Sequence, residues 1–220
     1  MTLVFSIYLL ILTIITLNGI VRFNKLTVPF KVLTVLMLIT LISEITSRIL
    51  VARIRNSSPP YHILVILEFA ATAFIYSRLI TGWRLHKLVL LSIIPFTILS
   101  VANTLFVQNF LSFPSLPIML SYIIFIAFAL ILFIQMLDSP KEITIFKQSV
   151  FWFNSAILIY SVTVPICFGV LNYMTRHHLN NALLGDLLLY FTLIYYLTIG
   201  YAIHIDKKQG NRHISGVYNE

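Results

Sequence analysis

Apolar stretches long enough to cross a lipid bilayer follow one another along almost the whole chain of 220 residues. We expect spanning helices at residues 2–21, 31–52, 61–82, 87–108, 116–137, 149–173 and 182–205. Because a spanning helix uses about 20 residues, only short connections remain between these segments. The sequence therefore predicts an all-α integral membrane bundle of seven transmembrane helices, with no soluble domain of any size.

Composition supports the same reading, since 59% of the residues are hydrophobic and only 10% are charged. A soluble domain of this length cannot bury that much apolar surface, so lipid must be a large part of its solvent. We expect a transmembrane domain over residues 1–205 and a short, basic, flexible tail over residues 206–220.

The distribution of basic residues predicts how the bundle is oriented. The predicted outer side holds only Arg48, Arg53, Arg55 and Arg176 of the fifteen. The other side collects the remaining eleven: Arg22, Lys25, Lys31, Arg78, Arg84, Lys87, Lys141, Lys147, Lys207, Lys208 and Arg212. Positive charge favours the cytoplasmic side, so the C-terminus is predicted to be cytoplasmic and the N-terminus external. The three arginines that end the second helix and follow it are a local exception to this rule.

The net charge of +8 is thus explained by helix ends that face the cytoplasm. The basic residues form no continuous face, and nucleic acid is not expected as a partner.

Three carboxylates fall inside or at the start of predicted spans, namely Glu44, Glu68 and Asp186. An ionisable group within a span costs about 2.5–3.5 kcal/mol on insertion scales, so such residues are the first candidates for function. All three belong to the predicted outer half of the bundle. This asymmetry predicts an outward-facing polar pocket.

The second and third helices each carry a polar stripe around one of these acids. Glu44 and Arg48 are four residues apart, so they can pair within the helix; such a pair could bind a ligand or simply fix helix depth. Glu68 is seven residues after Tyr61 and about 10 Å below the start of its helix. With no basic neighbour in its own helix, Glu68 must be protonated, hydrated or partnered by another helix.

Further polar residues lie near the same predicted surface. Asn103 shares a face with small polar residues of the fourth helix, and His178 and Asp186 belong to a polar entry to the seventh. The predicted ligand-binding residues are Glu44, Arg48, Tyr61, His62, Glu68, Asn103, His178 and Asp186. Asp186 could equally interact with the dipole at its helix start.

Motifs for a metal, a cofactor or catalysis are missing from the sequence. The adjacent His177 and His178 have no partner at a metal-binding spacing such as HxxxH, and Cys167 is the single cysteine. The last helix has no lysine for a retinal Schiff base, and no GxSxG or Walker motif occurs. We therefore expect no metal site and no cofactor.

A faint repeat relates the third helix to the seventh at an offset of 118 positions. It places His62 on Asn180 and Glu68 on Asp186. Three helices, a linker helix and three more would follow, which is a plan known among transporters.

Several short features also resemble an uncharacterised family of small bacterial seven-helix inner-membrane proteins. They are Glu44, Tyr61-His62 followed by Glu68-Phe69, Phe151-Trp152 with Tyr160, and the His/Asn-rich entry to the last helix. The resemblance implies a location in the bacterial inner membrane and a signalling role. Because the chain has no kinase or response domain of its own, signalling would require a protein partner.

Three functions remain open at this point. The leading hypothesis is a receptor-like or sensory protein that binds a small amphiphilic or cationic ligand in the outer pocket. The second is a small-solute or proton-coupled transporter of the 3+1+3 plan, with Glu68 and Asp186 as equivalent carriers. The third is an intramembrane lipid-modifying enzyme, with Glu68 or Asp186 as acid or base beside a histidine.

Overall fold

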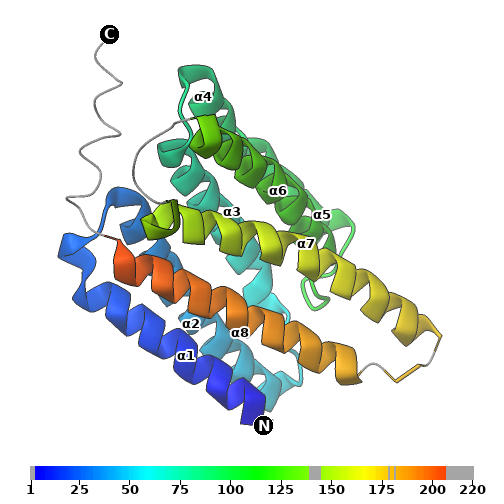
Figure 1. The fold of residues 1–220 in the computed structure, drawn as a ribbon. Coiled ribbons are helices and arrows are strands. Elements are labelled where there is room, and N and C mark those ends of the chain that lie inside the picture. Colours follow the sequence, from blue (N-terminus) through cyan, green and yellow to red (C-terminus); the bar gives the residue numbers. More distant parts are fainter. Residues whose placement is uncertain (1–2, 139–144, 178, 181, 207–220) are drawn as a thin grey trace.

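The computed structural model describes residues 3–138, 145–177, 179–180 and 182–206, and Figure 1 shows their arrangement. This part of the chain is helical and contains no strand. Its α-helices are α1 (Leu3–Val21), α2 (Val28–Ile54), α3 (Pro59–Leu79), α4 (Trp83–Leu91), α5 (Ile93–Phe106), α6 (Ser115–Asp138), α7 (Ser149–Arg176) and α8 (Ala182–Ile205). Two short 3₁₀ helices, η1 (Phe23–Lys25) and η2 (Ile145–Lys147), precede α2 and α7. The predicted tail lies outside the described residues, apart from Asp206.

Six helical segments are long and apolar enough to cross a membrane. They are α2, α3, the combined α4 and α5, α6, α7 and α8. The described apolar part of α1, Phe5–Val21, is shorter. The architecture is therefore that of a multi-pass membrane bundle, whereas a seventh crossing stays a prediction.

The predicted fourth helix is broken into two pieces. It starts earlier than expected, at Trp83, directly after Gly82 with its positive φ of 100°. It then breaks at Ser92. Pro95 explains the break, because proline has no N–H to donate and its ring would clash with the carbonyl of Leu91 in a continuous helix. Pro165, in contrast, lies inside the uninterrupted α7.

Six of the helices form a closed ring, in the order α1, α2, α3, α6, α7 and α8, with α8 packing back against α1. The α4–α5 segment lies outside this ring and packs against α3 and α6 (Figure 1). Two glycines allow α1 to approach its neighbours closely. A Cβ atom on Gly19 would lie 2.6 Å from Cγ2 of Thr34, and one on Gly200 would lie 2.7 Å from Cγ1 of Ile15.

The ring has two ends, and we name each half of the ring after a residue in it. The Glu44 half contains the start of α1, the α2–α3 turn and the start of α8, and the Asp206 half contains the opposite helix ends (Figure 1). In the Asp206 half, the ring of Phe153 contacts those of Phe30 and Tyr76, with centroids 6.2 and 5.5 Å apart. All three side chains are at most 2% exposed, so this half has a solid core.

Asp206 ties four helices together at its end of the bundle. Its carboxylate accepts hydrogen bonds from the backbone N–H of Thr27 (2.8 Å), the Thr27 hydroxyl (3.3 Å) and the Ser149 hydroxyl (3.0 Å). Arg22, just after α1, donates to the carbonyl and to Nδ1 of His204 in α8. Burial raises the pKa of Asp206, while these hydrogen bonds and the charge of Arg22 act in the opposite direction.

Candidate functional site

A cavity of about 300 Å³ lies inside the six-helix ring, and it extends from the Glu44 half to the middle of the ring. Every helix of the ring contributes side chains to its lining, whereas α4 and α5 contribute none. Phe113, in the connection between α5 and α6, completes it. The volume is at the lower end of the range of about 300–1,000 Å³ that is typical of small-molecule sites.

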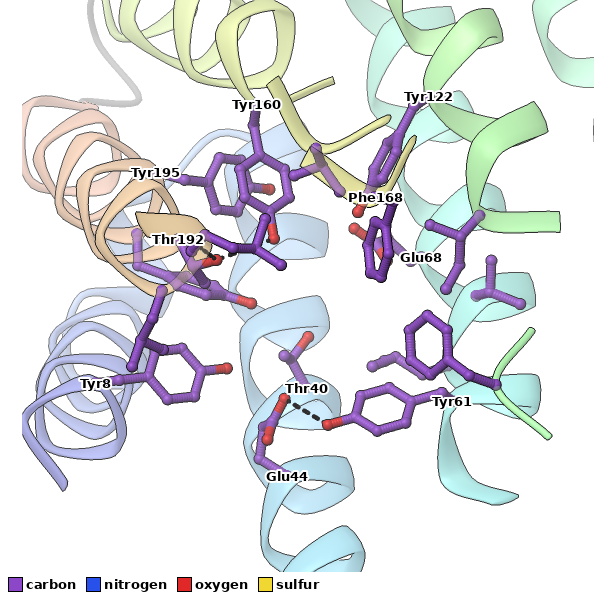
Figure 2. A pocket seen from close by; sticks show the side chains of 18 of the residues that line it. Tyr8, Thr40, Glu44, Tyr61, Glu68, Tyr122, Tyr160, Phe168, Thr192 and Tyr195 are labelled. Atoms are coloured by element: carbon purple, nitrogen blue, oxygen red, sulfur yellow. Dashed lines mark hydrogen bonds between the residues drawn. The ribbon is translucent and has the colours of Figure 1, made fainter. Parts of the chain in front are cut away.

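One wall of the cavity is acidic and is built by α2 and α3. Glu44 and Thr40 come from α2, and Tyr61 and Glu68 come from α3 (Figure 2). The Tyr61 hydroxyl donates a hydrogen bond of 3.2 Å to Oε1 of Glu44. Glu68, which also points into the cavity, makes no hydrogen bond with any of the described residues. The two acids therefore have different surroundings.

The opposite wall is a continuous row of tyrosines on α1, α8, α7 and α6. Successive ring centroids are separated by 5.6 Å (Tyr8–Tyr196), 5.0 Å (Tyr196–Tyr195), 4.3 Å (Tyr195–Tyr160) and 5.8 Å (Tyr160–Tyr122). The central pair is stacked, with 24° between the ring planes. We call these five residues the tyrosine wall.

The hydroxyl groups make the tyrosine wall polar as well as aromatic. Those of Tyr160 and Thr192 lie 3.4 Å apart, and the Thr192 hydroxyl also donates to the carbonyl of Leu188. Each ring thus presents an apolar body and a polar tip. The cavity can accept ligands that combine apolar groups with charge or hydrogen-bonding capacity.

Arg48 and Phe113 lie at the end of the cavity nearest the α2–α3 turn. The Phe113 ring contacts Tyr61 and Phe168, with centroids 5.5 and 5.6 Å away. The expected pairing of Arg48 with Glu44 is not formed, since no ion pair joins them in the described structure. The guanidinium of Arg48 lies 3.4 Å from the centroid of Phe5 instead, where cation–π attraction competes with the pairing.

Four of the eight residues that the sequence singles out line this cavity: Glu44, Arg48, Tyr61 and Glu68. Asp186 does not, although its neighbour Gly185 does, and its side chain is exposed. His178 lies outside the described residues. The three acids therefore do not converge on one cavity, but two of them do.

His62 and Asn103 are engaged elsewhere. His62 is buried, with Nδ1 2.8 Å from the Thr104 hydroxyl and Nε2 2.8 Å from the carbonyl of Ser112, so it joins α3 to α5 and to the connection after α5. Asn103 donates a 2.8 Å hydrogen bond to Gln108. Both contacts organise the connection that carries Phe113.

A second cavity of about 320 Å³ lies between α5 and α6, outside the ring. Its lining is mainly apolar and contains no charged side chain. Ser100 contributes a buried hydroxyl that finds no hydrogen-bond partner among the described residues. Asn103 also lines this cavity, although its amide donates to Gln108. With no charge and few polar groups, the cavity has little to specify a polar ligand.

Sequence reasoning missed most of the tyrosine wall. Tyrosines of membrane proteins are enriched at the two membrane interfaces, yet Tyr122, Tyr160 and Tyr195 each lie well inside a long apolar helix. That position is a usable signal, because a phenol in the middle of a span needs a polar surface to face. Their meeting in one row, however, depends on the order of helices around the ring.

The described residues contain no group of three histidine, cysteine, aspartate or glutamate side chains that could hold a metal ion. Glu44 and Glu68 are the two carboxylates of the lining. The cavity is therefore organised for binding through charge, aromatic rings and hydroxyl groups.

Together, the fold and the cavity define a multi-pass helical membrane protein with an acidic and aromatic cavity inside a six-helix ring. No family model matches the chain, and neither a curated protein nor a solved structure matches it.

Proposed function

We propose that this protein is a receptor-like or sensory membrane protein that binds a small ligand in the cavity of the Glu44 half. In this proposal the chain crosses a bacterial inner membrane seven times, with α1 as the first crossing. Its N-terminus is external and its C-terminus cytoplasmic, in keeping with the eleven basic residues on the latter side. The cavity then faces outward.

The observation that carries this proposal is that the cavity is closed on the side of the Asp206 half. The lining extends from the Glu44 half to the middle of the ring, where Tyr76, Asn154 and Phe153 close it off with side chains at most 1% exposed. The Tyr76 hydroxyl donates to Oδ1 of Asn154 at 2.8 Å, and Nδ2 of Asn154 donates to the carbonyl of Ala129 at 3.0 Å. A site closed toward the cytoplasm suits binding and signalling.

The contacts of Asp206 suggest how binding is transmitted. The helices that carry the tyrosine wall and Glu44 include α1, α2, α7 and α8, and the same four helices meet around Asp206. A ligand that draws the two walls together would strain these contacts at the other end. A protein partner on the cytoplasmic side would respond to the change in these contacts.

Transport is the second candidate, since an internal site with two acids also suits a carrier. It receives less support, because the proposed equivalent of Glu68, Asp186, does not line the cavity. The lipid-modifying enzyme receives less still. The cavity lining contains no histidine, and His62 is held by Thr104 and Ser112.

The proposal is tested by a binding screen on the protein in lipid nanodiscs. Amino acids, amines, nucleosides and short lipids are added in turn, and the unfolding temperature is recorded. Gly185→Trp places a large ring at the cavity, where a Cβ atom meets nothing within 4 Å. We expect at least one compound to stabilise the protein and to lose its effect in this variant.

Gly169→Trp is the matched control, because this exposed glycine of α7 also has open space around its Cβ position but does not line the cavity. A hit that survives Gly185→Trp binds elsewhere and contradicts the proposal. Counterflow of a labelled hit into proteoliposomes separates the two leading functions. Rapid exchange that Glu68→Gln abolishes would replace the receptor by the transporter.

A further inference from the structure

We infer that the ligand of the cavity is an organic cation, with its charge between Glu68 and the tyrosine wall and its apolar groups against the leucines of the lining. This inference rests on the proposed function and deepens it. It follows from the charge balance, the rings and the chemistry of the remaining surface.

Acidic side chains outnumber basic ones in the cavity. The charged side chains of the lining are Glu44, Glu68 and Arg48. Glu44 receives a hydrogen bond from Tyr61, whereas Arg48 lies over the ring of Phe5. Glu68 has no hydrogen bond from the described residues, and its near surroundings are aromatic. An ionised carboxylate in such a place needs an opposite charge to offset its desolvation.

Three tyrosines of the wall share the cavity with that acid. Tyr122, Tyr160 and Tyr195 point into the same space as Glu68 (Figure 2). Aromatic rings attract cations through the negative potential of their faces, and cavities lined by aromatic residues are the usual site for quaternary ammonium ions. Acid and rings thus favour the same sign of ligand charge.

The remainder of the lining selects an organic cation over an inorganic one. Leu36, Met37, Leu188 and Leu189 also line the cavity. A Ca²⁺ or Mg²⁺ ion is surrounded by about six or more oxygen ligands, whereas much of this lining is leucine and aromatic carbon. An ammonium ion that carries alkyl groups has apolar surface to bury there, and a volume of about 300 Å³ admits a compact one.

Choline and its neutral isostere 3,3-dimethylbutan-1-ol provide the test, together with phenyltrimethylammonium as a larger cation. Binding to the protein in nanodiscs is measured by calorimetry and by the shift in unfolding temperature. We expect at least one cation to bind and the neutral isostere to bind about ten-fold more weakly or not at all.

Three variants locate the binding. Glu68→Gln should weaken the cation by about thirty-fold or more, because it removes the facing charge. Tyr160→Leu should weaken it by about ten-fold, whereas Tyr160→Phe keeps the ring and most of the affinity. Asp186→Asn is the matched control, since it removes an exposed carboxylate that lies outside the lining, and it should change nothing.

The outcomes separate this inference from the proposed function. If the neutral isostere binds as well as choline, or if Glu68→Gln and Tyr160→Leu both leave affinity unchanged, the cation assignment is wrong. If no cation binds while the screen yields a neutral compound that Gly185→Trp blocks, the assignment is wrong but ligand binding stands. If nothing binds in either experiment, both fail.

Discussion

The two halves of the six-helix ring use polar residues in opposite ways. In the Asp206 half, polar side chains meet one another, as in the Tyr76–Asn154 bond and the three hydrogen bonds to Asp206. In the Glu44 half, two acids and a row of tyrosines face a cavity instead of each other. The ring thus has paired polar side chains in its core at one end. At the other end, beside contacts such as those of His62, it has an incompletely paired site, as expected where function and stability compete.

The largest effect is expected at Asp206. Asp206→Ala leaves two donors of Thr27 and the Ser149 hydroxyl without their acceptor, at a position only 3% exposed. We expect the free energy of unfolding to fall by about 2–3 kcal/mol, because hydrogen bonds to a charged group each contribute about 1.5–3 kcal/mol and water can replace part of them. Denaturant unfolding in detergent micelles measures the change.

Asp186→Ala is its control, since this carboxylate begins the same helix but is exposed. It should change stability by less than about 0.5 kcal/mol. Equal losses in the free energy of unfolding would mean that the contacts of Asp206 do not stabilise its half more than Asp186 stabilises the other.

Asn154 should give the next largest effect. Asn154→Leu removes the acceptor of the Tyr76 hydroxyl and the donor to the carbonyl of Ala129. We expect a loss of about 2 kcal/mol, given about 0.6–1.7 kcal/mol for a hydrogen bond between membrane helices. Asn103→Leu, which cuts one bond of a half-buried side chain, should lose less than half as much by the same unfolding measurement. A reversed order would show that the Asp206 half is not the stabilised one.

The sequence predicted the helical bundle well because hydrophobic length is a local property. The expected segments at 31–52 and 116–137 fall within α2 and α6, and the basic tail side coincides with the Asp206 half. The break at Ser92 was not predicted. A proline can either lie within a continuous helix or interrupt it. The helix is interrupted near Pro95 but continues through Pro165.

The lining of the cavity was predicted in part, and the reason is again the range of the interactions. Glu44, Tyr61 and Glu68 were found because each is unusual within its own helix. His62 was equally unusual, but its partners Thr104 and Ser112 come from another part of the chain. The prediction that Glu44 can pair with Arg48 missed the competing ring for the same reason, because Phe5 belongs to α1.

Tyr61→Phe should have a smaller effect on stability. It removes the hydrogen bond of 3.2 Å to Glu44 and keeps the ring contact with Phe113. We expect a loss of about 0.5 kcal/mol in the unfolding assay, since bonds of this kind average about 0.6 kcal/mol in membrane bundles. A loss as large as that of Asp206→Ala would mean that the Glu44 half also depends on its polar contacts.

Glu68→Gln should have the smallest effect on stability, and its sign is the sharpest test of the comparison. A carboxylate within a span costs about 2.5–3.5 kcal/mol on insertion scales, and the substitution removes the charge without breaking any hydrogen bond of the described residues. We expect stability to stay unchanged or to rise by about 1 kcal/mol. A loss above about 1 kcal/mol would show that Glu68 is a structural residue. An unchanged or more stable protein that no longer binds cations would show instead that the acid is kept for its ligand.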